Sequence, residues 1–230
     1  QEVGDVCASV LADVDANVSW TTELPPDRMT LLKNVFRQNL DLSRSGRAAI
    51  LCSLGKSDEA FPIFEESIKS RREGMSANPD DRNSKDQLAS QLAIYGQYLL
   101  RCGRYDDGAG ALAESNQLAE ANFNSDPTNA KYKRYFGTTQ YYLGVARDAQ
   151  GLTSDATALF ERSRVLRSEM HTNSPDNSNK VNLMLSEARL GNIDATLTLI
   201  KELEKQDAKD PDLRLDLARA YSQISKASEG

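Results

Sequence analysis

Two markers recur along this chain at the same spacing, and that spacing limits the folds it can adopt more than any other feature. The first is a proline after an acidic or polar run, found at Pro79, Pro127, Pro175 and Pro211. The second is the glycine of a polar turn, found at Gly55, Gly103, Gly151 and Gly191. The first three members of each set lie 48 residues apart, and each of those glycines precedes its proline by 24 residues. Two markers that keep one phase over three units predict a repeat protein.

The segments between the markers have the period of an α-helix. In 81–102, Leu88, Leu92, Tyr95 and Leu99 follow one another at spacings of 4, 3 and 4 residues, which is one face of a helix. We expect the turn glycine to end one helix, the Asp or Ser behind it to cap the next, and the proline to lie outside helix interiors. Sustained alternation of Val or Ile with polar residues is absent. The sequence therefore predicts an all-α chain of helix–turn–helix units.

Small and large residues hold fixed places around each turn. Gly96 and Gly144 each lie 7 residues before a turn glycine. After the turn, each unit has a small residue, a large apolar residue and a serine: Ala60, Phe64 and Ser67; Gly108, Leu112 and Ser115; Ala156, Phe160 and Ser163. Over roughly residues 40–225 this pattern resembles the tetratricopeptide (TPR) repeat family. The resemblance implies a right-handed α-solenoid of TPR-like helix–turn–helix repeats.

The unit is longer than an ordinary TPR unit of about 34 residues. We expect each helix to gain about two turns, which elongates it without rotating its apolar face. The expected boundaries are 1–24 for an N-terminal capping helix, 25–80, 81–128 and 129–176 for repeats 1 to 3, 177–212 for a shorter repeat 4, and 213–230 for a C-terminal capping helix and tail. We expect one helix over 2–18 and another from about 27 to 54, with Trp20 between them as part of the cap or as a ligand platform.

The long unit is also similar to repeat arrays of bacterial multidomain proteins. Among these are the regions that follow the kinase domain in membrane-attached bacterial Ser/Thr protein kinases, and the stretch 11–43 is similar in kind to the helical lead-in found there. No kinase motif occurs in this chain. Because the sequence begins at Gln1 rather than Met, we expect a processed chain or a piece of a longer protein.

Composition narrows the classes of function. The net charge of −6 and the pI near 5.0 argue against nucleic-acid or anionic-membrane partners, both of which need basic patches. We expect Cys7, Cys52 and Cys102 to pack as small hydrophobic residues within helices. With His171 as its only histidine, the sequence contains no catalytic constellation, metal site or cofactor motif. We therefore expect a protein that is not an enzyme and uses no cofactor.

The resemblance implies a concave face lined by the first helix of each unit. The groove-facing positions of the family correspond here to Gln87, Ser90, Ile94, Gln97, Arg101, Lys131, Tyr135, Thr138, Tyr142, Val145, Asn182, Leu185 and Arg189. The partner-binding candidates among them are Gln97, Arg101, Tyr135, Thr138, Tyr142, Asn182 and Arg189. Tyr and Arg suit peptide recognition, but the two tyrosines equally well fill space between long helices.

One TPR subfamily grips C-terminal carboxylates with a Lys/Asn/Lys/Arg clamp. Its positions hold Ser45, Ala49, Ala93, Gln97, Tyr141 and Val145 here, so the clamp is missing and a co-chaperone role is not expected.

The predicted function is a non-enzymatic protein–protein interaction scaffold that binds a peptide or a partner domain on its concave face. An alternative is the sensor or regulatory segment of a larger bacterial signalling protein, such as a membrane Ser/Thr kinase. Self-association through the end units is a third reading of the same features. We expect no nucleic-acid partner and no membrane contact by this segment. The sequence does not determine the compartment: it is compatible with a cytoplasmic location, and with an extracytoplasmic one if the segment follows a membrane anchor.

Overall fold

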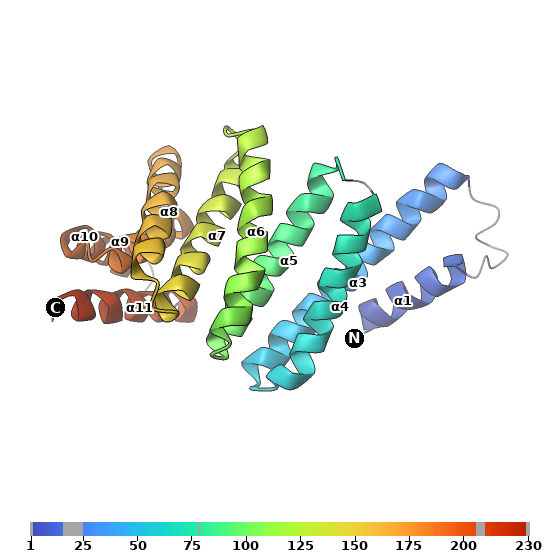
Figure 1. The fold of residues 1–230 in the computed structure, drawn as a ribbon, viewed down its shortest axis with the longest axis horizontal. Coiled ribbons are helices and arrows are strands. Elements are labelled where there is room, and N and C mark those ends of the chain that lie inside the picture. The colour runs from blue at the N-terminus through green and yellow to red at the C-terminus, as the bar shows by residue number, and fades with distance from the viewer. Residues whose placement is uncertain (1, 16–24, 78, 206–209, 229–230) are drawn as a thin grey trace. The chain divides into compact units, whose positions relative to one another are not determined.

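The computed structural model describes residues 2–15, 25–77, 79–205 and 210–228, and the regular structure in these ranges is all α-helical (Figure 1). The helices are α1 (Glu2–Asp15), α3 (Pro26–Ser53), α4 (Ser57–Ala77), α5 (Arg82–Arg101), α6 (Tyr105–Ser125), α7 (Ala130–Ala149), α8 (Thr153–Asn173), α9 (Asn177–Arg189), α10 (Ile193–Glu204) and α11 (Pro211–Ser228). The chain divides into two compact units, residues 1–84 and 85–230, with the boundary in the first turn of α5.

The first unit contains α1, α3 and α4, with α1 and α4 both packed against α3. Cys7, Ala48 and Phe64 are among its buried apolar residues. The helix expected over 27–54 is present as α3. The helix expected over 2–18 is present to Asp15, and its last residues, like Trp20, lie outside the described residues.

The second unit is a row of helices in chain order, with α5 to α8 side by side and α9 to α11 at its C-terminal end (Figure 1). Helices α5 and α7 have 20 residues each and α6 and α8 have 21, and equivalent helices begin 48 residues apart. Helices α9 and α10 are shorter, with 13 and 12 residues. The prediction of an all-α arrangement of helix pairs with elongated helices is therefore confirmed.

The turn glycines end the first helix of each pair, as the sequence predicts. Gly55, Gly103, Gly151 and Gly191 all have φ between 72° and 77°, a left-handed conformation that glycine adopts without a steric penalty. At each turn the N–H after the glycine donates to a carbonyl five residues back, as Arg104 does to Leu99 at 2.9 Å. This is the Schellman arrangement, which satisfies the last carbonyls of a helix.

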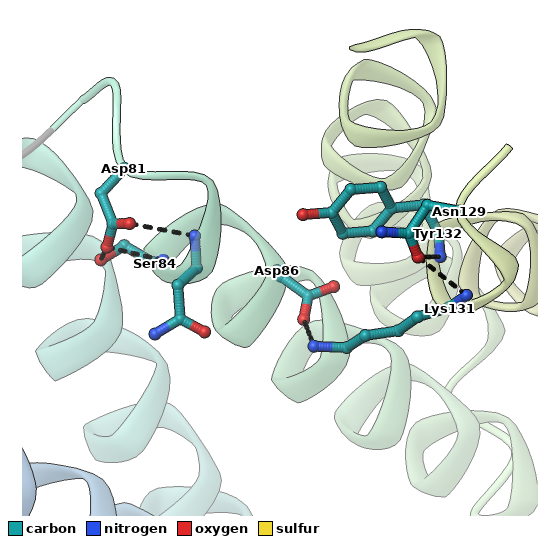
Figure 2. Close-up of polar contacts among 7 residues, drawn as sticks. Asp81, Ser84, Asp86, Asn129, Lys131 and Tyr132 are labelled. Atoms are coloured by element: carbon teal, nitrogen blue, oxygen red, sulfur yellow. Dashed lines mark hydrogen bonds and ion pairs between the residues drawn. The ribbon is translucent and has the colours of Figure 1, made fainter. Parts of the chain in front are cut away.

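The prediction that Asp or Ser behind each glycine caps the second helix is wrong. The cap positions of α6 and α8 hold Arg104 and Leu152, which form no side-chain cap bond, and the acidic residues lie within the first turn. Capping side chains occur instead at the starts of α5, α7 and α9. The carboxylate of Asp81 accepts the N–H of Ser84 at 3.0 Å, and Asn129 accepts that of Lys131 at 3.0 Å (Figure 2). A chain leaving a Schellman turn begins its next helix at once, whereas the proline segment has room for a cap.

The small positions of the repeat are places where two helices approach closely. A methyl group at Gly96 would lie 2.6 Å from Cγ of Leu112, and one at Gly144 would lie 2.7 Å from Cε1 of Phe160. Ser67, Ser115 and Ser163 have no exposed surface. The pattern of small, large and serine positions therefore follows from helix packing.

The expected packing of the cysteines is wrong for one of the three. Cys7 is buried, Cys52 is half-buried, and Cys102 is exposed because it lies in the turn after the last residue of α5. None of these three cysteines forms a disulfide bond.

Candidate functional site

A pocket of about 180 Å³ lies in the second unit near the C-terminal ends of α5 and α7, beside α9 and α11. Its lining residues are Gln97, Leu100, Arg101, Tyr141, Tyr142, Val145, Leu185, Arg189 and Arg219. Three first helices contribute, together with α11, which packs against α9 in the place of a further first helix. The sequence predicts that α5, α7 and α9 line a concave face, whereas it predicts the segment of α11 as a capping helix.

The structure brings together four of the seven partner-binding candidates. Gln97, Arg101, Tyr142 and Arg189 line the pocket, as do the projected positions Val145 and Leu185. Leu185 is buried rather than exposed, so it contributes to the wall of the pocket. Leu100, Tyr141 and Arg219 also line the pocket and are absent from the projected face.

The remaining three candidates, Tyr135, Thr138 and Asn182, lie outside the pocket. The Lys131 ammonium lies 5.7 Å from the centre of the Tyr135 ring. It also forms a 2.5 Å ion pair with the buried carboxylate of Asp86 (Figure 2). The hydrogen bond to Asp86 raises the pKa of Lys131. Lys131 thereby joins α7 to α5, and its charge is already balanced within the unit. The groove-facing positions therefore differ in their surroundings. Those near the start of α7 make contacts within the unit, and those near the ends of α5, α7 and α9 line the pocket.

The aromatic residues of the pocket are anchored in the core beneath it. Tyr141 is buried and meets Tyr142 edge to face at 5.2 Å between ring centres, and the Phe160 ring at 5.8 Å. Tyr142 is half-buried and packs against two core clusters while it lines the pocket. Burial raises the pKa of Tyr142, and Arg101 and Arg219 act in the opposite direction. Tyr142 therefore packs and also faces a positively charged pocket.

A buried cation lies on the core side of Tyr141. The Arg167 guanidinium lies 4.5 Å from the centre of the Tyr141 ring and donates to the carbonyl of Asn182 at 2.8 Å and to the hydroxyl of Ser186 at 2.9 Å. Burial lowers the pKa of Arg167 to about 10. The ring face and the two oxygens hold the guanidinium in place, so Asn182 contributes its backbone to the core.

The pocket is rich in arginine and contains no acidic lining residue. Arg189 pairs with Asp148 at 3.1 Å, and Arg219 pairs with Asp216 at 2.8 Å. Arg101 is the last residue of α5, where a cation interacts favourably with the helix dipole, and its guanidinium lies 5.2 Å from the centre of the Tyr98 ring. Within the ranges that the structure describes, Arg101 forms no ion pair. Each guanidinium therefore retains N–H groups that no carboxylate among the described residues occupies.

Among the described residues, no three His, Cys, Asp or Glu side chains lie close enough together to hold a metal ion.

Within the described ranges, the structure contains no helix with the length and apolar character that crossing a membrane requires.

No protein-family model matches the chain. No curated protein matches it either. Among solved structures, the chain is similar to a thermophilic TPR protein from Thermus thermophilus, with 18% sequence identity and a TM-score of 0.33. The match covers 79% of this chain and 99% of that one.

Proposed function

We propose that this chain is a non-enzymatic protein-interaction scaffold that holds a peptide or a loop of a partner protein in the pocket formed by α5, α7, α9 and α11. The observation that carries the proposal is the convergence of Arg101, Tyr142 and Arg189, from three separate helices, on one pocket. Tyr and Arg are the residues most often found at the energetic centres of protein interfaces. No cofactor is part of this proposal.

The pocket also has the mixed character that peptide recognition needs. Tyr142 and Val145 offer apolar contact area, and Tyr142 loses little rotamer freedom on binding because packing already holds its ring. Gln97 and Arg101 line the same pocket with polar side chains. Helices already packed together present these groups with little rearrangement, which favours binding.

The proposal is tested by partner capture with the whole chain. Wild-type protein, a Gln97→Ala/Arg101→Ala variant and a control variant are each immobilised, and the proteins they retain from source-cell extract are quantified by mass spectrometry. The control is Gln117→Ala/Arg162→Ala, which makes the same two changes at exposed positions of α6 and α8. Helical circular dichroism checks that all three are folded.

Loss of one or a few retained proteins in the pocket variant, with their retention by the control, is the expected result. Equal retention by all three proteins would show that partner binding does not use this pocket.

The alternative, a sensor or regulatory segment of a larger bacterial signalling protein, is compatible with the same pocket. It is distinguished by an immunoblot of fractionated source cells. A soluble band near the 25.4 kDa of this chain supports a free-standing scaffold, and a larger band in the membrane pellet supports the alternative. Self-association stays a prediction, which concentration-dependent light scattering tests.

A further inference from the structure

The charge of the pocket is opposite to the charge of the chain as a whole. The chain has a net charge of −6, yet Arg101, Arg189 and Arg219 meet in one pocket without an acidic lining residue. Like charges brought together raise the electrostatic energy unless counter-charges are present, and among the described residues Asp148 and Asp216 supply one each to Arg189 and Arg219 but none to Arg101. An occupant that carries negative charge therefore gains more from this pocket than a neutral one.

The arginines are placed to share an anionic occupant. They come from α5, α9 and α11, and two of them have one nitrogen engaged by a single carboxylate of the chain. Guanidinium groups bind carboxylates through pairs of parallel N–H donors, so partly engaged arginines still have donors to offer. Arg101, which has no carboxylate partner among the described residues, offers the most.

The apolar part of the pocket narrows the choice of occupant. Leu100, Val145 and Leu185 line the pocket together with the arginines. A free inorganic anion would leave this apolar surface in water, whereas a peptide covers it with its neighbouring side chains. Cations on three separate helices also match several carboxylates along an acidic run better than they match the single charge of a chain end.

Resting on the proposed function, we propose that the pocket takes an acidic segment within a partner protein, with side-chain carboxylates of Asp or Glu bound by Arg101, Arg189 and Arg219 and an adjacent apolar side chain packed against Val145. Recognition of this kind needs no free C-terminus. The scaffold would then select partner segments in which acidic residues stand next to an apolar residue.

The probe is a fluorescein-labelled peptide of about a dozen residues in which Glu alternates with Leu and Gly, acetylated and amidated at its ends. Fluorescence anisotropy measures its affinity for the whole chain at low and at physiological salt. The same peptide with Gln in place of Glu tests the need for carboxylates, and a form with a free C-terminus tests whether the chain end contributes.

The protein variants are Arg101→Gln and Arg219→Gln, with Arg162→Gln on the exposed surface of α8 as the control. Arg101 forms no ion pair among the described residues, and the bond of Arg219 to Asp216 is a partly exposed pair within one helix. Such a pair contributes little to stability, so both variants are expected to fold, which circular dichroism checks.

We expect saturable binding of the Glu peptide that weakens at higher salt, because screening reduces the attraction between exposed charges. The Gln peptide and each pocket variant should bind about tenfold more weakly or worse, and Arg162→Gln should bind as the wild type does. Equal affinity for the Gln peptide, or undiminished binding by both pocket variants, would overturn the proposal. Binding only by the form with a free C-terminus would reassign the pocket to chain ends and overturn it too.

Failure of this inference is distinguishable from failure of the proposed function. If the Glu peptide does not bind but Gln97→Ala/Arg101→Ala still loses a captured partner, the pocket binds a partner of other chemistry. If neither experiment responds to the pocket variants, the proposed function fails as well.

Discussion

The hydroxyl of Ser163 on α8 donates a hydrogen bond of 2.8 Å to the backbone carbonyl oxygen of Gly137 on α7. Ser115 on α6 donates the equivalent bond of 2.6 Å to Ala89 on α5, with donor and acceptor both 48 residues earlier. Both hydroxyls belong to residues without exposed surface. Each long helix pair in the second unit is therefore joined at its centre by the same polar contact, which fixes how far one helix slides along the other.

Removing this contact should destabilise the second unit. We expect Ser115→Ala to lower the free energy of unfolding by about 1 kcal/mol, the usual net value of a hydrogen bond. Ser115→Val should lower it further, because extra methyl groups must also enter a filled site. Urea unfolding followed by circular dichroism measures both, with Ser222→Ala at an exposed position of α11 as the control. A Ser115→Ala protein as stable as the wild type would contradict this role.

The close packing at Gly144 predicts that a change to Ala lowers stability, whereas helix propensity alone predicts an increase. Gly to Ala inside a helix normally adds about 1 kcal/mol of stability. At Gly144, however, the new methyl group would lie 2.7 Å from the Phe160 ring, and overpacking of this kind costs about 1–3 kcal/mol. We therefore expect Gly144→Ala to lower the melting temperature. Gly110→Ala, in α6 with nothing within 4 Å of its Cβ position, should raise it. Thermal unfolding of both variants and the wild type shows whether each melting temperature rises or falls.

The cap of α9 predicts a defined pH dependence. The N–H of Asn179 donates to Asp176 at 2.8 Å, and this bond lowers the pKa of Asp176. Because the ionised form is favoured in the folded protein, its contribution is present above an unfolded-state pKa of about 4 and is lost as the pH falls through the lower folded pKa.

Asp176→Asn should therefore be nearly as stable as the wild type at pH 7, since Asn caps as well as Asp and Asn129 does so at α7. Below about pH 4 the variant should lose less stability than the wild type. Urea unfolding at pH 7 and pH 3 measures the difference, and Asp176→Ala, which lacks the cap at both values, is the reference. A pH profile of Asp176→Asn that parallels the wild type would refute the assignment.

A buried ion pair in the first unit predicts a non-additive response. Asp41 and Arg71 lie 3.7 Å apart, and their side chains are only 7% and 8% exposed. Burial raises the pKa of Asp41, against the attraction of Arg71 and Arg44, and burial lowers the pKa of Arg71. Arg71→Met should cost about 3–5 kcal/mol because it leaves a buried carboxylate without its closest cation.

The double variant Asp41→Leu/Arg71→Met should cost less than the sum of the two single changes, since neither charge is then left buried alone. A double-mutant cycle by chemical unfolding measures this coupling. Strictly additive effects would show that the two charges do not stabilise one another.

The framework of the fold was predictable because the recurring glycines are required locally, either by the backbone conformation of a turn or by the close packing of two helices. Gly103 and Gly151 occupy a left-handed conformation that other residues rarely adopt, and Gly96 and Gly144 lie where no side chain fits. The cap positions were mispredicted because residues near Arg104 start a helix directly from the preceding turn. Nothing in the local sequence distinguishes that start from one with room for a capping side chain.

The candidate site was only partly predictable for a different reason. Projection of one helix face finds Gln97, Arg101 and Arg189, because neighbouring first helices present equivalent faces. Arg219 was missed because the last helix was assigned as a cap, although it packs against α9 and completes the pocket. The internal use of Lys131 depends on the buried carboxylate of Asp86 on another helix, which a one-helix pattern does not contain.

The equal length of the two long helix pairs affects how the number of repeats can change in evolution. Residues 82–129 and 130–177 begin and end at equivalent points, with the same glycine turn and the same serine bond between them. Unequal crossing-over between these points would add or remove one whole pair and keep every later helix in phase. Because contacts in such arrays join neighbours only, the rest of the array is left intact. Addition of a pair can thus lengthen the array and keep the pocket residues, whereas loss of either pair would remove part of the pocket, because both pairs contribute to its lining.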